Sequence, residues 1–319
     1  MKTGFRKAAF AGLVCALMTI AGAARADLDA AIADYNAGNF DAAADQFRRL
    51  AGDGDNQAQF WLGYLYTTGE GVGRDYEEAR IWFEKSAENG NVEAYSFIGY
   101  LYYNAHGVSK DYREAARYYR RGANLGDADS QVNLGYAYEI GEGAPRDPEK
   151  AVALYRAAAG QGSSWAQNRL GYLYKSGNGL PQDYAQAQYW FRLAADQGDS
   201  ASQASLGWLL LQGQGGPKDY DEALRLFRSA ADSGNPSGQN GMGYTYEYGY
   251  GVAQDYLAAA DWYLRAAEQD YVISQFNLAL LYENGNGVPQ DLDEARRWYR
   301  KAADLGDADA KAALDRLGQ

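Results

Sequence analysis

A five-residue motif recurs in this chain at a constant interval of 36 residues. Its first copy is Leu62-Gly63-Tyr64-Leu65-Tyr66, and further copies start at residues 98, 134, 170, 206, 242 and 278. A fixed period of roughly 20–50 residues is typical of an array of supersecondary units, each of which buries its apolar face against its neighbours. The chain is therefore expected to fold as a repeat array and not around one central core.

Each repeat holds two helical patterns joined by a glycine-rich loop. The first pattern places small and apolar residues on one helical face. In the first repeat this face consists of Ala58, Leu62, Leu65, Tyr66 and Gly69. The second pattern carries two adjacent aromatic residues, Trp82 and Phe83, between Ala79 and Ala87. The repeats are therefore predicted to be antiparallel helical hairpins, and the fold class to be all-α.

An aspartate ends the loop of every repeat. In five of the seven repeats Glu or Gln follows three residues later. This pattern predicts that the aspartate carboxylate caps the second helix of the hairpin. A metal or acid–base role is the alternative, but the 36-residue spacing assigns each aspartate to a separate helix start. The seven residues are Asp75, Asp111, Asp147, Asp183, Asp219, Asp255 and Asp291. The first helices of later repeats are predicted to be capped in the same way by Asn91, Asp127, Ser163, Asp199 and Asn235.

Residues 1–26 have the features of an export signal. Basic residues precede an apolar run over residues 8–23, and Ala24-Arg25-Ala26 offers a cleavage pattern. A membrane anchor is the alternative, but the run is short of the roughly 20 residues that a span needs. Cleavage would leave Asp27 as the first residue and remove the only cysteine, Cys15. We expect a periplasmic or secreted protein without disulfides or thiol chemistry.

The charge of the remaining chain limits its partners. Without residues 1–26 it keeps 26 basic and 42 acidic residues, a net charge of −16. Nucleic acids and anionic lipids attract positive charge, so neither is an expected partner. No other stretch is apolar enough to cross a membrane, and no membrane insertion of the mature chain is expected.

The two ends of the array depart from the repeat. Residues 27–55 form a first helical pattern and a second one, which Asn39 is predicted to cap. Residues 308–319 form a last helix without a partner. The ends of a repeat array need polar capping units. We therefore expect an N-terminal capping helix pair over 27–55, seven repeats over 56–307 and a C-terminal capping helix over 308–319.

The repeat resembles a known family over nearly all of residues 56–318. The combination of Leu-Gly-x-Leu-Tyr, Gly-x-Gly-Val-Pro-x-Asp-Tyr and Ala-x-x-Trp-Tyr-x-x-Ala-Ala-x-x-Gly is similar to the Sel-1-like repeat, a branch of the tetratricopeptide-repeat superfamily. The resemblance implies a right-handed α-solenoid and an adaptor that assembles protein complexes, often exported in bacteria. Some cysteine-rich members are described as binding or hydrolysing β-lactams. Because the mature part of this chain has no cysteine, such an activity is not expected here.

The third position of the motif is the candidate binding position. On a helical wheel, Tyr64 falls opposite the face that holds Leu62 and Leu65, and in a solenoid of helix pairs that side lines the concave groove. Tyrosine and tryptophan combine apolar area with a hydrogen-bonding tip, which suits peptide recognition and sugar stacking. We call these residues the aromatic row. Its members are Tyr64, Tyr100, Tyr136, Tyr172, Trp208 and Tyr244, and Leu280 replaces the aromatic residue in the last repeat.

Two alternatives stay open for the aromatic row. Its rings could instead pack against one another as core between repeats, because aromatic stripes at helical spacing are often core. If the row does bind, the ligand is a protein partner or a cell-envelope glycan, either peptidoglycan or exopolysaccharide. The sequence alone does not show whether the row is a binding surface or core, or whether its ligand is a protein or a glycan.

The sequence offers little for catalysis. The single histidine, His106, lies in a loop and is expected to be exposed, and no metal-binding, nucleophile or nucleotide-binding motif is present. We predict no enzyme activity, no catalytic or metal site and no cofactor. A hydrolase of the cell envelope is the least favoured alternative. The predicted function is an exported scaffold that binds protein partners in the cell envelope.

Overall fold

The computed structural model describes residues 25–318. Within this range the chain is helical, with short loops and no strand, which confirms the predicted all-α fold. The proposed export signal lies almost entirely outside the described residues. None of the described helices combines the length and apolar character that a membrane span requires.

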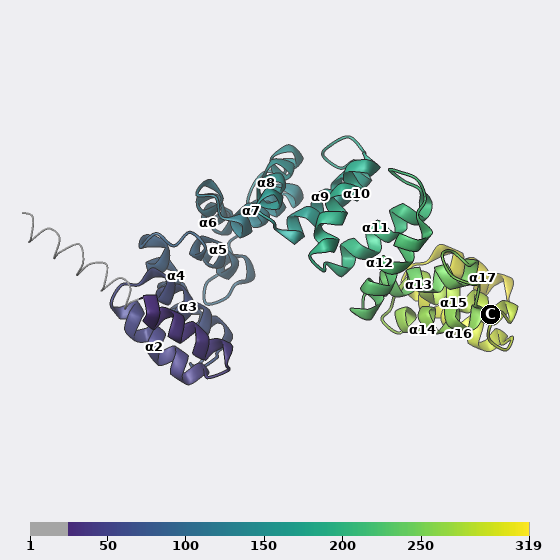
Figure 1. Cartoon of the computed structure of the whole chain (residues 1–319), viewed down its shortest axis with the longest axis horizontal. Coiled ribbons are helices and arrows are strands. Elements are labelled where there is room, and N and C mark those ends of the chain that lie inside the picture. The colour runs from purple at the N-terminus through teal and green to yellow at the C-terminus, as the bar shows by residue number, and fades with distance from the viewer. Residues whose placement is uncertain (1–24, 319) are drawn as a thin grey trace, which may run out of the picture. The chain divides into compact units, whose positions relative to one another are not determined.

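The helices form successive hairpins (Figure 1). Residues 25–36 are helical and are followed by α2 (Phe40–Gly52). The first helices of the repeats, here called helices A, are α3 (Asn56–Thr68), α5 (Ala94–Asn104), α7 (Ala128–Ile140), α9 (Ser164–Ser176), α11 (Ser200–Gln212), α13 (Pro236–Tyr248) and α15 (Val272–Asn284). The second helices, here called helices B, are α4 (Tyr76–Glu88), α6 (Tyr112–Asn124), α8 (Pro148–Gly160), α10 (Tyr184–Asp196), α12 (Tyr220–Asp232), α14 (Tyr256–Ala267) and α16 (Leu292–Asp304). A single helix, α17 (Ala308–Arg316), follows.

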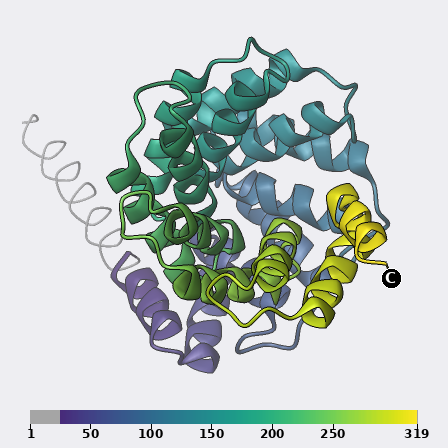
Figure 2. The same cartoon turned by 90° about the vertical axis from the view of Figure 1, so that its right-hand side faces the viewer.

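The chain divides into two compact units, the first ending at Ala158 and the second beginning at Ala159. In unit 1 each helix from α2 to α7 packs on the next one along the chain, and in unit 2 the same holds from α9 to α17. Helices A also contact each other, as α5 and α7 do in unit 1 and α11 and α13 do in unit 2. Figure 2 shows these hairpins from a second side.

The core of each hairpin forms around the second aromatic residue of helix B. Phe83, Phe191 and Phe227 are fully buried, as are Leu62 and Leu65 of the first motif. The motif glycine makes room for this ring, since a Cβ atom on Gly63 would lie 2.9 Å from the Phe83 ring. A helix position without a side chain therefore lets helix A approach the aromatic ring of helix B.

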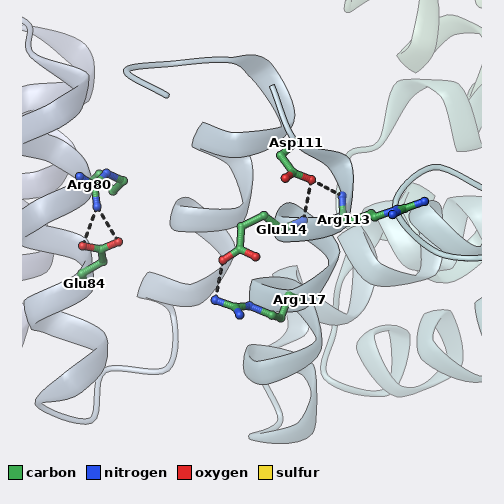
Figure 3. A network of polar contacts seen from close by, with 6 residues as sticks. All are labelled: Arg80, Glu84, Asp111, Arg113, Glu114 and Arg117. Atoms are coloured by element: carbon green, nitrogen blue, oxygen red, sulfur yellow. Dashed lines mark hydrogen bonds and ion pairs between the residues drawn. The ribbon is translucent and has the colours of Figure 1, made fainter. Parts of the chain in front are cut away.

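Aspartate caps begin all helices B, as the sequence predicts. In α6, one carboxylate oxygen of Asp111 accepts the backbone N–H groups of Arg113 and Glu114 at 2.9 and 3.0 Å (Figure 3). The glutamate does not close a capping box, because the Asp111 N–H donates to the carbonyl of Tyr102. Glu114 instead pairs with Arg117 on its own helix.

The predicted caps of helices A and of α2 are only partly correct. Asp127, Ser163, Asp199 and Asn235 accept backbone N–H groups at their helix starts. Asn91 does not cap α5, because that helix begins at residue 94 and the Asn91 side chain accepts only the N–H of Glu93. Asn39 does not cap α2 through its side chain either, since its amide group donates to Asp34.

Replacing Asp255 with alanine is expected to lower the free energy of unfolding by about 1 kcal/mol. The Asp255 carboxylate accepts the N–H groups of Leu257 and Ala258, both at 3.0 Å, and α14 has no acidic residue in its first turn to compensate. Urea unfolding followed by circular dichroism measures the loss. Asp255→Asn keeps an accepting oxygen and is the control, with an expected change below about 0.5 kcal/mol. Equal losses in both variants would contradict the capping role.

Candidate functional site

The aromatic row lies in the middle of helices A. Tyr64, Tyr100 and Tyr136 belong to unit 1, and Tyr172, Trp208 and Tyr244 belong to unit 2. The neighbouring motif positions are buried, with Leu62 and Leu65 fully inaccessible. The row lies outside these fully buried positions, but its rings reach the edge of the core: the ring of Tyr172 lies 5.0 Å from that of Phe191, and the ring of Trp208 lies 4.9 Å from that of Phe227.

In unit 1 the exposure of the row differs between repeats. Tyr64 is half-buried, and its ring lies 6.2 Å from the ring of Tyr35 and 5.8 Å from that of Trp61. Tyr100 is 44% exposed and Tyr136 is 37% exposed. Tyr64 therefore contributes to packing at the N-terminal end, whereas Tyr100 and Tyr136 present aromatic surface to solvent.

In unit 2 the row is exposed at its start and packed further on. Tyr172 is 37% exposed, and its hydroxyl group lies 2.9 Å from the hydroxyl group of Ser205. Trp208 and Tyr244 are half-buried and pack on each other with ring centroids 5.4 Å apart. The row is thus neither wholly core nor wholly surface, and Tyr172 is its most accessible member in this unit.

One loop position lies beside the row, and the sequence did not reveal it. This position follows the left-handed residue that ends helix A, which is a glycine in every repeat except the second, where it is Ala105. The position holds Glu70, His106, Glu142, Asn178, Gln214, Tyr250 and Asn286. His106 stacks on Tyr76 at 4.4 Å and lies 5.6 Å from the ring of Tyr100, so this histidine is half-buried and not fully exposed as expected.

Other residues at this loop position also contact aromatic side chains. Tyr250 stacks on Tyr220 at 4.8 Å and lies 5.9 Å from the ring of Tyr244. Glu142 accepts a hydrogen bond of 2.9 Å from Tyr103, three residues after Tyr100. The residue type at this position changes from repeat to repeat. The charge and polarity of the surface beside the aromatic row therefore differ between repeats.

Two tyrosines close to the row, Tyr103 and Tyr248, have raised pKa values. Burial, followed by the hydrogen bond to Glu142, raises the pKa of Tyr103 to about 12. Burial, followed by the nearby charge of Glu247, raises the pKa of Tyr248 to about 12. Tyr103 and Tyr248 are therefore neutral hydroxyl groups that can donate hydrogen bonds at ordinary pH.

Carboxylates at the ends of three helices A accept hydrogen bonds from tyrosines of helices B. Tyr155, Tyr263 and Tyr299 each donate to a glutamate sixteen residues earlier, at 2.8, 2.6 and 2.7 Å. In the last pair, Glu283 also binds Arg316 of α17, and this guanidinium group lowers the pKa of the carboxyl. A hydrogen-bonded carboxylate with a lowered pKa is held in place as an anion and is a poor general acid.

The described residues contain no group of three or more metal-ligating side chains. The capping aspartates accept backbone N–H groups at separate helix starts, as in Asp111 and Asp255. Within residues 25–318, the candidate site is thus the aromatic row with the loop position beside it.

Comparison with known proteins identifies the family of the repeat. A family model described as "Sel1 repeat" matches residues 56–91, 92–127, 128–163, 166–199, 200–235, 236–271 and 272–307. No curated protein that was searched matches the chain.

Two solved structures are similar over most of the chain. One is a protective antigen present in uropathogenic Escherichia coli strains, which displays an SLR fold. It is 36% identical with a TM-score of 0.79, and the match covers 95% of this chain and 67% of that chain. The other is a Sel1 repeat protein from Oxalobacter formigenes. It is 31% identical with a TM-score of 0.65, and the match covers 93% of this chain and 89% of that chain.

Proposed function

This chain belongs to the Sel1 repeat family, and we propose that it is an exported scaffold that binds protein partners through the aromatic row. Sel1 repeat proteins typically mediate protein–protein interactions. The observation that carries the proposal is the exposure of Tyr100, Tyr136 and Tyr172, because a partly exposed aromatic ring offers contact area to a partner. The apolar segment before Asp27 supports an envelope location.

The double variant Tyr100→Ala/Tyr136→Ala is expected to bind its partner at least about tenfold more weakly. Exposed tyrosines at the centre of an interface often contribute more than 1 kcal/mol each, whereas surface substitutions change folding stability little. Affinity capture from an envelope extract, quantified by mass spectrometry, measures the binding, and the melting temperature measures stability. Ile81→Ala, at a residue of α4 that is 36% exposed, is the control. A fall in melting temperature that fully accounts for the lost capture would instead assign these rings to the core.

A cell-envelope glycan is the second candidate ligand. The exposed ring of Tyr172 beside the Ser205 hydroxyl group offers a stacking face and a polar contact, which a sugar can use. Retention of the purified protein on protein-free peptidoglycan or exopolysaccharide, lost in Tyr172→Ala, supports this alternative. Capture of specific proteins without such retention supports the scaffold.

A further inference from the structure

In unit 1, carboxylates lie on the same helical faces as the exposed tyrosines of the row. Glu93 and Asp129 precede Tyr100 and Tyr136 by seven residues, which is close to two turns of helix. Glu93 already has helical backbone angles, and Asp129 lies in the first turn of α7. Both are exposed. Each exposed tyrosine therefore has a carboxylate on its face toward the start of its helix.

Two further carboxylates, Glu70 and Glu142, follow the C-terminal ends of α3 and α7. Glu70 accepts a hydrogen bond of 3.0 Å from the Tyr35 hydroxyl group, and Glu142 accepts one of 2.9 Å from Tyr103. Both donors are neutral, and burial with the carboxylate contact raises the pKa of Tyr35 as well. Hydrogen bonds from neutral hydroxyl groups fix the position of a carboxylate and leave its negative charge in place.

Helices A of unit 1 carry no positively charged side chain. The helices α3, α5 and α7 contain no lysine or arginine, whereas α6 alone carries four arginines. Figure 3 shows Arg80 on α4 and Arg117 on α6, each paired with a glutamate of its own helix. Each loop of unit 1 does carry a basic residue. Arg74 and Lys110 lie over the rings of Tyr76 and Tyr112 at 5.9 and 5.3 Å, and Arg146 donates to the carbonyl group of Glu139 at 3.1 Å.

We propose that the aromatic row of unit 1 binds an extended, arginine- or lysine-rich segment of a partner protein. This inference rests on the proposed function and adds the charge of the partner. Aromatic faces attract cations, and carboxylates form charge-assisted hydrogen bonds with them. This surface offers both features: the exposed rings of Tyr100 and Tyr136, and the carboxylates of Glu93, Asp129 and Glu142 near the ends of their helices. An acidic segment would meet uncompensated negative charge on the same surface.

Selection from a random peptide library tests the charge of the partner. A phage-displayed library of random twelve-residue peptides is panned on the purified protein at low salt, with the Tyr100→Ala/Tyr136→Ala variant as the counter-selection. We expect the peptides that depend on the two tyrosines to be enriched in arginine and lysine. Enriched peptides that depend on the tyrosines but show no basic excess overturn this inference and leave the proposed function standing. Failure to enrich any tyrosine-dependent peptide counts against both.

Matched charge variants test whether a basic peptide is attracted by the carboxylates beside the aromatic row. Replacing Glu70, Glu93 and Glu142 with glutamine is expected to weaken binding of a selected basic peptide roughly tenfold at low salt, as three partly exposed ion pairs are lost. The control removes the same charge from exposed positions of helices B by replacing Glu77, Glu88 and Glu149 with glutamine. We expect this control to change binding less than about twofold. Equal weakening in both variants would assign the attraction to net charge and overturn the inference.

Discussion

Gly143→Ala is expected to lower the free energy of unfolding by about 3 kcal/mol or more. Gly143 is the second glycine of its loop and has a φ of +76°, and a Cβ atom on it would lie 1.9 Å from the carbonyl oxygen of Tyr112. The obstacle is the backbone at the start of the preceding helix B, so a change of side-chain rotamer cannot relieve the clash. Urea unfolding followed by circular dichroism measures the effect.

Gly126→Ala is the matched control for this prediction. Gly126 also has a positive φ, +93°, but a Cβ atom on it would have no neighbour within 4 Å. Gly126→Ala is expected to lower the free energy of unfolding by about 1 kcal/mol, which is the cost of the left-handed conformation alone. Similar losses in both variants would mean that the loop does not approach the preceding helix as closely as the structure shows.

Phe227→Ala is expected to lower the free energy of unfolding by about 3–5 kcal/mol. The Phe227 ring is fully buried and fills the space left by two glycines, since Cβ atoms on Gly207 and Gly241 would lie 2.8 and 2.3 Å from it. Removing the ring leaves a cavity between helices A of two successive repeats, which the rigid helices cannot close. Leu257→Ala, at a 66% exposed residue of the next helix B, is the control and should cost less than about 0.5 kcal/mol. A loss below 1 kcal/mol in Phe227→Ala would contradict this packing.

The sequence was sufficient to predict the hairpins and most of their starts. The period, the buried Leu62 and Leu65 and the capping aspartates are local patterns that repeat along one chain, so each copy reinforces the others. The predicted start of α5 was wrong. Asn91 has the residue type of a cap, but the helix begins three residues later. Capping propensity alone does not distinguish between neighbouring starts.

Contacts between repeats could not be predicted from the local pattern. The sequence places Gly143 in a loop and does not indicate that it packs on the preceding helix B, as it does in the structure. Buried glutamines form a second set of unforeseen contacts: Gln59 and Gln167 donate across the loop to the carbonyl groups of Ala51 and Ala159, at 3.1 and 3.2 Å. These contacts depend on how one hairpin packs on the next, and a helical wheel of a single helix gives no information about that packing.

The exposure of the aromatic row follows only in part from the sequence. The helical wheel placed the aromatic row away from the hairpin core, but it could not separate Tyr100, exposed by 44%, from the half-buried Tyr64. That difference arises from Tyr35, which packs on Tyr64 from the N-terminal helix. The loop position of His106 was missed as part of the surface, because its neighbours Tyr76 and Tyr100 lie 30 and 6 residues away in sequence.

Site-specific photo-crosslinking tests most directly whether the aromatic row is the binding surface. A benzophenone amino acid replaces Tyr136 in one variant and Ile81 in another, since these residues of helices A and B are exposed almost equally, by 37% and 36%. Irradiation of the cells that produce the protein should give discrete protein adducts from position 136 and none from position 81. The same adducts from both positions, or adducts from position 81 alone, would contradict the assignment of the binding surface to the aromatic row.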